Sequence, residues 1–140
     1  MAFTGSQVAS LFRKERNQAV HDVSTDTIMM ALYTNAATLN SATTVYTTTG
    51  EVVNANYTAG GKVLSGVSLT IPTTGGDPVL TWANPSWTPG AFVARGALIY
   101  NASKSNKAMY ILDFGQDRIA DPFVVRLPPA GVEIMTYASA

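Results

Sequence analysis

The hydrophobic pattern divides the chain into a short helical start and a long β-rich remainder. From Ser6 onward the apolar residues recur at helical spacing, at Val8, Leu11, Phe12 and Ala19. Either Thr4 or Ser6 can cap the first turn with its hydroxyl. We therefore expect a helix of about three to four turns that ends before His21. Its charged face, Arg13 to Arg16, is expected to meet solvent or, alternatively, a partner.

After Asp22 the hydrophobic period changes toward two, and Thr, Val, Tyr and Ile become frequent, which is typical of strands. Residues 27–34, TIMMALYT, are apolar without alternation, which predicts a strand covered on both faces. The Thr-rich residues 35–52 predict an exposed loop with a short edge strand. In residues 57–72 we expect a strand that ends at Pro72, with an apolar face made of Val63, Val67, Leu69 and Ile71.

The second half of the chain has the pattern of short strands separated by Gly and Pro turns. Residues 91–101 and 107–115 are two β-rich runs joined by the polar residues 102–106, a loop of a length that hairpins use. Asp113-Phe114-Gly115 is expected to lead the second run into a turn. Further short strands are expected in residues 79–83, 123–127 and 131–137.

Together these patterns predict a mainly β protein, with an antiparallel β-sandwich or barrel-like domain and one N-terminal α-helix. A chain of 140 residues is long enough for one well-buried core. We divide it into an N-terminal helical arm, residues 1–21, and a β-sandwich-like domain, residues 22–140.

Composition narrows the possible partners. Nine basic and nine acidic residues give a formal net charge of 0, so the chain offers no positive field for nucleic-acid phosphates, and we expect no nucleic-acid partner. No apolar run approaches the length of about 20 residues that a membrane helix needs, and the N-terminal pattern is not that of a signal peptide, so we expect no membrane partner. With 13% charged and 46% hydrophobic residues, copies of the chain repel each other little, which favours assembly.

The residues offer little for catalysis. The chain has no cysteine, and His21 has neither a second imidazole for a metal pair nor a recognisable triad around it. Asp113-Phe114-Gly115 stands without the other motifs of a kinase. Asp113, Asp117 and Asp121 could hold calcium, but they match no EF-hand, and loop solvation is the preferred interpretation. We therefore predict a protein that is not an enzyme, with no catalytic, cofactor-binding or metal-binding residues.

Arg95 lies inside a β-rich run. A guanidinium buried without a partner is costly, so Arg95 is expected either to face solvent or to be paired. If it points inward, Asp26 and Asp113 are the natural partners, and Arg95→Ala should be destabilising. This is a structural role and not a catalytic one.

The aromatic residues have two interpretations. Packing in the core or at a subunit interface is the preferred one, and a platform that stacks on sugars is the alternative. The residues concerned are Trp82, Trp87, Tyr57 and Tyr100. We assign structural roles to Arg95, Asp26, Asp113, Trp82 and Tyr100.

Several short motifs occur in a recognisable order over most of the chain, from about Asp22 to the C-terminal strands. They are Asp26-Thr27-Ile28, Ala31-Leu32-Tyr33-Thr34, Tyr57-Thr58-Ala59-Gly60-Gly61 with Leu64, Thr81-Trp82, Ala94-Arg95-Gly96-Ala97-Leu98-Ile99-Tyr100-Asn101, and Asp113-Phe114-Gly115. In this order they resemble a family of small β-rich virion structural proteins of tailed bacteriophages.

The resemblance implies a structural role: a capsid decoration, or cement, protein that binds the outer surface of the phage head and stabilises the shell. Its partners would be the major capsid protein and copies of itself in a homo-oligomer, in the virion, after synthesis in the host bacterial cytoplasm. A tail, neck or fibre component, with a glycan-binding surface, is the alternative. Glycan binding by the isolated chain would favour that alternative.

Two segments are expected to reach the partner. They are residues 1–20 and the Thr-rich residues 41–50. Within the helix the expected contacts are Leu11, Phe12, Arg13 and Arg16. On this hypothesis, removal of residues 1–20 should leave the β domain folded and abolish incorporation into particles.

Overall fold

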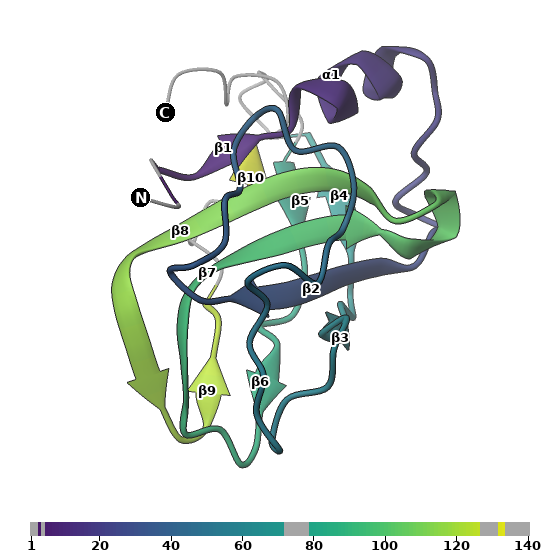
Figure 1. Cartoon of the computed structure of the whole chain (residues 1–140). Helices are drawn as coiled ribbons and strands as arrows, with labels where there is room; N and C mark the ends of the chain where they lie inside the picture. Colours follow the sequence, from purple (N-terminus) through teal and green to yellow (C-terminus); the bar gives the residue numbers. More distant parts are fainter. Residues whose placement is uncertain (1–2, 4, 72–78, 127–131, 134–140) are drawn as a thin grey trace.

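The computed structural model describes residues 3, 5–71, 79–126 and 132–133, the last two as backbone only. The elements in chain order are β1 (Gln7–Val8), α1 (Ser10–Asn17), β2 (Ile28–Tyr33), β3 (Lys62–Val63), β4 (Ser68–Thr70), β5 (Val79–Thr81), β6 (Ser86–Trp87), β7 (Phe92–Asn101), the 3₁₀ turn η1 (Ala102–Lys104), β8 (Lys107–Ala120), β9 (Phe123–Val124) and β10 (Val132–Glu133). The protein is thus mainly β with one α-helix in the described part, as the sequence predicts (Figure 1).

The strands form antiparallel sheets. The largest has the order β1-β8-β7-β2-β3, a second has the order β10-β5-β4, and β6 pairs with β9. The edge strands β1 and β3 do not pair with each other among the described residues, so the large sheet does not close into a barrel. Buried residues from these sheets and from α1 form one hydrophobic core.

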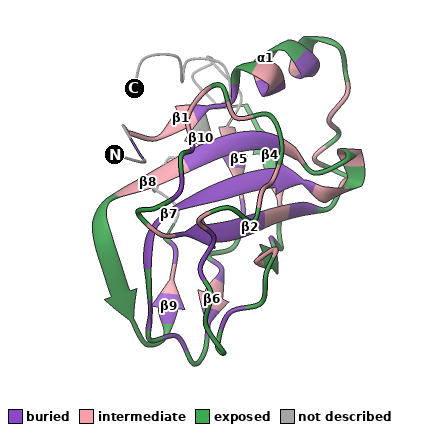
Figure 2. Cartoon of the chain, viewed as in Figure 1, coloured by how far each residue is buried: buried purple, intermediate pink, exposed green. Residues whose placement is uncertain are grey.

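The β7–β8 hairpin contains the two longest strands of the described structure, and β7 is the central strand of the large sheet. The apolar sequence of β7 suits this position. Every β7 residue from Ala94 to Asn101 is buried, because β8 and β2 flank the strand and other segments cover it (Figure 2). The predicted hairpin is confirmed, and so is the buried strand in residues 27–34, which is β2.

The end of the hairpin differs from the sequence prediction. Asp113-Phe114-Gly115 does not lead into a turn, because β8 continues to Ala120. Instead β8 bulges there: Gly96 pairs with Asp113 while Ala94 pairs with Arg118. Gly115 has a φ of +84°, which a glycine adopts without strain, so the motif is a bulge within the strand.

The N-terminal segment packs as part of the β domain and not as a separate arm. Helix α1 has 8 residues, begins at Ser10 and has Ala9 at its N-cap without a side-chain cap, so the expected longer helix with a Ser6 cap is wrong. Residues before it form β1, which pairs with β8, and the Ser6 hydroxyl accepts a hydrogen bond from the Asp113 amide at 2.9 Å. Pairing with the edge of β8 outweighs the local helical pattern. Thr4 lies outside the described residues.

We therefore expect removal of residues 1–20 to destabilise the domain. Phe3, Val8 and Phe12 are at most 2% exposed and belong to the common core. The Phe3 ring lies over Gly96, where an added Cβ would come within 2.5 Å of it. The burial of these side chains argues against the expectation that the β domain folds without this segment, because deletion would expose the core.

Two further expectations need correction. The Thr-rich residues 35–52 contain no strand, only isolated bridges such as Val45 with Lys107, and Ala37 and Leu39 within them are buried. The single strand expected in residues 57–72 is instead β3 and β4, which belong to different sheets. Its expected apolar face is largely exposed, with Val63 at 60%, Leu69 at 48% and Ile71 at 72%. Leu64, between the two strands, is the buried residue.

The C-terminal strands are only partly described. Val79–Thr81 and Phe123–Val124 confirm two of the expected short strands as β5 and β9. Of the strand expected in residues 131–137, the structure describes Val132–Glu133, which pairs with β5. The rest of that prediction and Pro72 lie outside the described residues.

A matched pair of glycine substitutions tests the close contact between the 57–61 loop and β2. Gly61 and Gly115 have φ values of +81° and +84°, so alanine costs about 1–2 kcal/mol of backbone strain at either position. At Gly61 an added Cβ would also overlap the Met30 carbonyl, whereas at Gly115 nothing lies within 4 Å. We expect Gly61→Ala to lower the free energy of unfolding by about 1–3 kcal/mol more than Gly115→Ala in urea denaturation. Equal losses would show that the two backbones do not touch.

Candidate functional site

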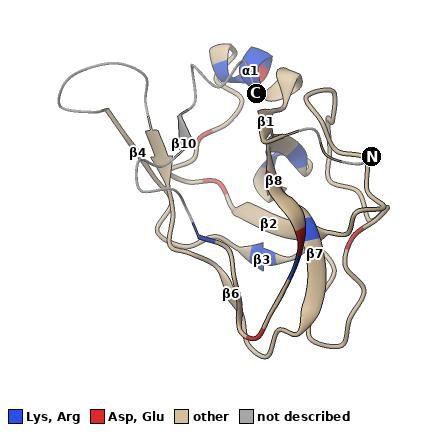
Figure 3. Cartoon of the chain, turned by 90° about the vertical axis from the view of Figure 1, so that its left-hand side faces the viewer, with Lys and Arg blue, Asp and Glu red and all other residues tan. Residues whose placement is uncertain are grey.

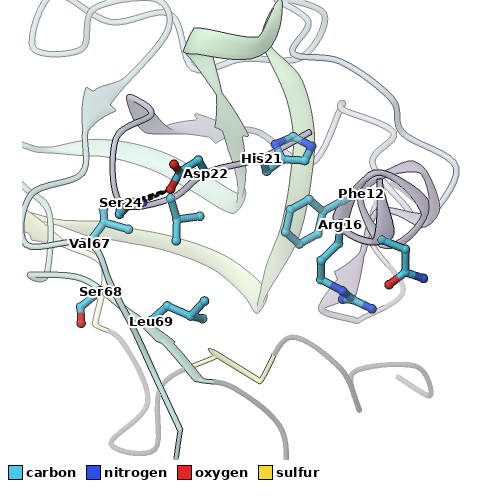
Figure 4. Close-up of a pocket in the computed structure, with 10 residues that line it drawn as sticks. Phe12, Arg16, His21, Asp22, Ser24, Val67, Ser68 and Leu69 are labelled. Atoms are coloured by element: carbon cyan, nitrogen blue, oxygen red, sulfur yellow. Dashed lines mark hydrogen bonds between the residues drawn. The ribbon is translucent and has the colours of Figure 1, made fainter. Parts of the chain in front are cut away.

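A groove of about 680 Å³ lies between α1 and β4. Its lining residues come from α1, from the segment after it and from the β4 region: Phe12, Arg16, Asn17, His21, Asp22, Val23, Ser24, Val67, Ser68 and Leu69. Figure 4 shows Leu69 pointing into the space opposite Phe12 and Arg16, while Ser68 points away from it. The groove thus lies between the only described α-helix and β4, the edge strand of the β10-β5-β4 sheet.

The groove has an apolar floor and an open apolar lip. Phe12 is 2% exposed and packs against the rings of His21 and Tyr110, with centroid distances of 4.9 and 5.3 Å. Val23 and Val67 are partly buried against the core. Leu69, at 48% exposure, forms the lip, so the groove leaves apolar surface in contact with water.

Behind the groove, His21 is held in a buried polar network. Its Nε2 lies 2.9 Å from Oε1 of Glu15, and its Nδ1 lies 3.0 Å from Nδ2 of Asn101. The Asn101 amide nitrogen also donates to Asp26 at 2.7 Å, while its oxygen accepts from the Ser103 amide, which fixes the orientation of the amide group. Nδ1 of His21 must therefore accept, and the ring proton is assigned to Nε2, which donates to Glu15.

Two lysines complete the network. Lys107 Nζ donates to Oε2 of Glu15 at 2.6 Å, and Lys104 Nζ lies 3.3 Å from Oδ1 of Asp26. Burial raises the pKa of Glu15, but the hydrogen bonds from Lys107 and His21 outweigh it and leave that pKa below its ordinary value of 4.5. Burial also raises the pKa of Asp26, but the hydrogen bonds from Asn101, the Asp22 amide and Lys104, with the charge of Lys104, together outweigh it and leave that pKa below its ordinary value. Both carboxylates are therefore ionised and paired near neutral pH.

The polar groups around His21 are engaged with one another. Both ring nitrogens of His21 are engaged, so the ring has no free nitrogen with which to take a proton from a substrate. The described residues contain no cluster of three or more metal-ligating side chains. Asp113 and Asp117 lie within β8, and Asp121 accepts a hydrogen bond from the Gly90 amide, so the expected polar loop that could hold calcium is not formed.

A second apolar surface lies at the open end of the hairpin, residues 92–94 and 118–120. Val93 and Ile119 are directly paired across the strands and are 44% and 67% exposed. Beside them is a recess of about 520 Å³ lined by Phe114, Arg118, Ile119, Ala120, Phe123, Val124, Val125 and Arg126. Figure 2 shows this part of β8 exposed, and in Figure 1 it lies at the lower left, away from α1.

Arg95 and Asp113 meet in the interior, as the sequence suggests for an inward-pointing arginine. Arg95 Nη1 lies 3.1 Å from Asp113 Oδ1, without the alignment of a hydrogen bond, and the two side chains are 8% and 10% exposed. The guanidinium also lies 5.7 Å from the centroid of the Phe3 ring. Asp113 accepts from the amides of Gly5 and Gly115, so this carboxylate ties the N-terminal segment to the β8 bulge. Asp26, the other suggested partner, belongs to the His21 network instead.

The four aromatic residues singled out from the sequence are buried, so they present no platform for sugars. Their exposed fractions are 5% for Trp82, 3% for Trp87, 7% for Tyr57 and 2% for Tyr100. Tyr100 donates a hydrogen bond to the Gly60 carbonyl at 2.7 Å and stacks on Tyr46 at 4.8 Å. Their role in the structure is packing, and a glycan-binding surface built from these rings is excluded by their burial.

The expected partner contacts on the helix are only partly accessible. Phe12 is 2% exposed and could meet a partner only from within the groove, whereas Leu11, Arg13 and Arg16 are half-buried. That these four residues contact a partner stays a prediction. Sequence reasoning also missed Glu15, Asn101 and Glu51. Glu51 is 6% exposed and accepts hydrogen bonds from Tyr46 and Tyr57 at 2.6 Å each. Only Asn101, at the end of the apolar run 97–100, carried a signal in the sequence; Glu15 lies in a charged run and Glu51 follows a Thr-rich one.

Basic and acidic residues are interspersed over the described elements (Figure 3). In Figure 3 the basic residues lie on α1, on β3 and along β7 and β8, with acidic residues between them. No helix in the described part of the chain is long and apolar enough to cross a membrane.

The lowered pKa values of Glu15 and Asp26 predict a loss of stability in acid. A carboxylate with a lowered folded pKa stabilises the protein above its unfolded pKa, and this contribution is lost as pH falls through the folded value. The free energy of unfolding should therefore fall as pH drops below about 4.5, the ordinary value for Glu15. Glu15→Gln should reduce this dependence in urea denaturation between pH 7 and pH 3 (about four pH units). The exposed Asp117→Asn serves as control, and an unchanged acid dependence in Glu15→Gln would contradict the account.

The Arg95–Asp113 and Lys104–Asp26 ion pairs differ in exposure, so removing the cation should cost a different free energy of unfolding in each. Arg95→Ala leaves the buried Asp113 without its cation and removes packing on Phe3, so we expect a loss of about 3 kcal/mol. Lys104 is 36% exposed and Asp26 keeps its Asn101 hydrogen bond, so Lys104→Ala should cost less than about 1 kcal/mol. Thermal or urea unfolding measures both, and a cost for Arg95→Ala as small as that for Lys104→Ala would argue against the buried pair.

Comparison with known proteins found no similar family, protein or structure. A scan against models of protein families found no match, and neither did searches of curated proteins and of solved structures. The function of the chain must therefore be inferred from its own residues.

Proposed function

We propose that this chain is a structural protein of a bacteriophage virion, and specifically a capsid decoration protein that binds the outer surface of the head and stabilises the shell. The observation that carries the proposal is the set of large apolar side chains that stay exposed although the core is complete: Val45, Val53, Val63, Leu69, Ile71, Val93 and Ile119. Contiguous apolar surface marks contact with another protein, and two pairs in this set lie together: Val93 with Ile119 across β7 and β8, and Leu69 with Ile71 at β4.

Three features support a role in assembly. The ordered sequence motifs resemble small virion proteins of tailed phages. The polar groups best suited to chemistry, His21, Glu15 and Asp113, are occupied with one another or with other groups of the chain. The formal net charge of 0 and the low share of charged residues allow many copies to sit close together on a particle.

The open end of the β7–β8 hairpin is the surface we assign to the major capsid protein. Val93 and Ile119 form an exposed cross-strand pair there, next to the recess that contains Phe114 and Phe123. Arg118 and Arg126 line the same recess, so an apolar segment of the shell that carries a carboxylate would fit it in shape and charge. Many copies with a modest contact each would stabilise a shell through avidity.

The sequence also assigned the Thr-rich residues 41–50 to partner contact. Backbone hydrogen bonds connect this segment to α1 and to β8 and its preceding turn. The Ser41 carbonyl accepts from the Ser10 amide, and the amides of Tyr46 and Ala108 bond to Asn106 and Thr44. Their role in contact with the shell stays a prediction.

Binding to particles made without the chain tests the proposal. We expect the purified chain to bind such particles, and Ile119→Glu to lower its occupancy at least tenfold, since a carboxylate would be buried in an apolar contact. Gln116→Glu adds the same charge on the same exposed stretch of β8 and should bind nearly as the natural chain does. Failure of the natural chain to bind would overturn the proposal, and normal binding of Ile119→Glu would overturn the assigned surface.

A further inference from the structure

We propose that the chain pairs with a second copy of itself through the free edge of β4, across a two-fold axis that passes beside Leu69. The pairing would extend the β10-β5-β4 sheet into the partner copy and cover the groove between β4 and α1. This inference rests on the proposed function, for which it names a partner and a contact.

The first observation is the open edge of β4. Among the described residues β4 pairs with β5 on one side and with no strand on the other. Its residues Ser68, Leu69 and Thr70 are all exposed, and none of them is charged or a proline. Charges, prolines and bulges commonly protect edge strands against pairing, and β4 contains none of them. Its length of 3 residues limits the pairing to a short contact, but its edge can accept another strand.

The second observation is the apolar surface beside that edge. Leu69 and Ile71 are 48% and 72% exposed, and Leu69 points into the groove above the buried Phe12 (Figure 4). In the sheet Leu69 is paired with Leu80, which is completely buried. The two leucines thus form an apolar row across the sheet that runs from the core to the open edge of β4. A strand added at this edge would cover the exposed end of the row.

The third observation indicates that the added strand comes from the same chain. Antiparallel pairing centred on Leu69 places Ser68 opposite Thr70 of the second copy, and Val67 opposite its Ile71. Hydroxyl residues then meet hydroxyl residues and apolar residues meet apolar ones, which are favourable cross-strand pairs. A two-fold interface uses the same patch on both copies, and this patch matches itself.

The charges around the groove agree with a second copy. Arg16 and Asp22 both line it, so its walls carry one basic and one acidic side chain. A surface with both charges can face its own copy without net repulsion, in keeping with the formal net charge of 0.

A single introduced cysteine tests the pairing directly. The natural chain contains no cysteine, so a new thiol reports only on its own surroundings. In the proposed register the two Leu69 Cα atoms are about 4.5–5.5 Å apart, which suits a disulfide. We expect Leu69→Cys to form a covalent dimer with oxidised glutathione and Val53→Cys, which is 95% exposed in a loop, to remain monomeric at the same concentration. Equal yields from the two variants would overturn the pairing.

The solution mass provides a second measurement. Light scattering should give the natural chain twice its mass of 14.8 kDa and Leu69→Glu a single chain mass, with circular dichroism to verify that the variant is folded. A natural chain of single mass, or a folded Leu69→Glu that remains a dimer, would overturn the inference. If Leu69→Glu does not fold, the cysteine experiment decides the question.

Both measurements use the isolated chain and are independent of particle binding. A monomer that binds particles would overturn the pairing and leave the proposed function standing. A dimer that binds no particle would support the pairing and overturn the proposed function.

Discussion

The burial of β7 on both faces is the constraint on which the rest of the structure depends. Because β7 is buried on both faces from Ala94 to Asn101, no water reaches its polar side chains there, so Arg95 and Asn101 each require partners from elsewhere in the chain. For Arg95 the partner is Asp113, whose carboxylate also accepts from the Gly5 amide. For Asn101 the partners are His21 and Asp26. The two polar positions of one strand thereby fix both the N-terminal segment and the segment that follows α1.

The charged side chains in the interior are paired with other groups of the chain, so we expect the residues that act on a partner to lie at the surface. His21, Glu15 and Asp113 would be the first candidates for chemistry in a chain of this composition, and each is occupied inside the fold. Large apolar side chains nevertheless stay exposed at two places on the surface: the Val93–Ile119 pair on the hairpin, and Leu69 with Ile71 beside β4. A protein with two such surfaces at different places can hold a shell with one and its own copy with the other, which is the arrangement that we propose for a decoration protein.

Sequence patterns predicted the elements whose pairing is local. The β7–β8 hairpin and the buried strand β2 follow from apolar runs of the right length with a short polar loop between them. The N-terminal segment was mispredicted because its helical spacing is real but residues 7–8 gain more by pairing with the edge of β8, a contact more than a hundred positions away in sequence. Val63, Leu69 and Ile71 alternate as a strand should, yet the chain splits there between two sheets, which periodicity alone does not indicate.

The candidate site was predicted less well than the fold. The Arg95–Asp113 pair could be foreseen because a buried guanidinium needs a carboxylate, and few carboxylates were available. The network around His21 could not, since Glu15, Asn101 and Asp26 come from three separate segments that meet only when β7 is covered. The groove between α1 and β4 likewise depends on the short helix and the split strand, the two features that the pattern misplaced.

The central claim is that the chain acts by contact on the outside of a phage head. The most direct measurement is a cryo-electron microscopy reconstruction of the particle from which it comes. The account predicts density of this fold on the outer capsid surface, with the open end of the β7–β8 hairpin against the shell. Density at the neck or tail would support the alternative location in the virion and contradict the decoration role, and a particle without such density would contradict the virion role itself.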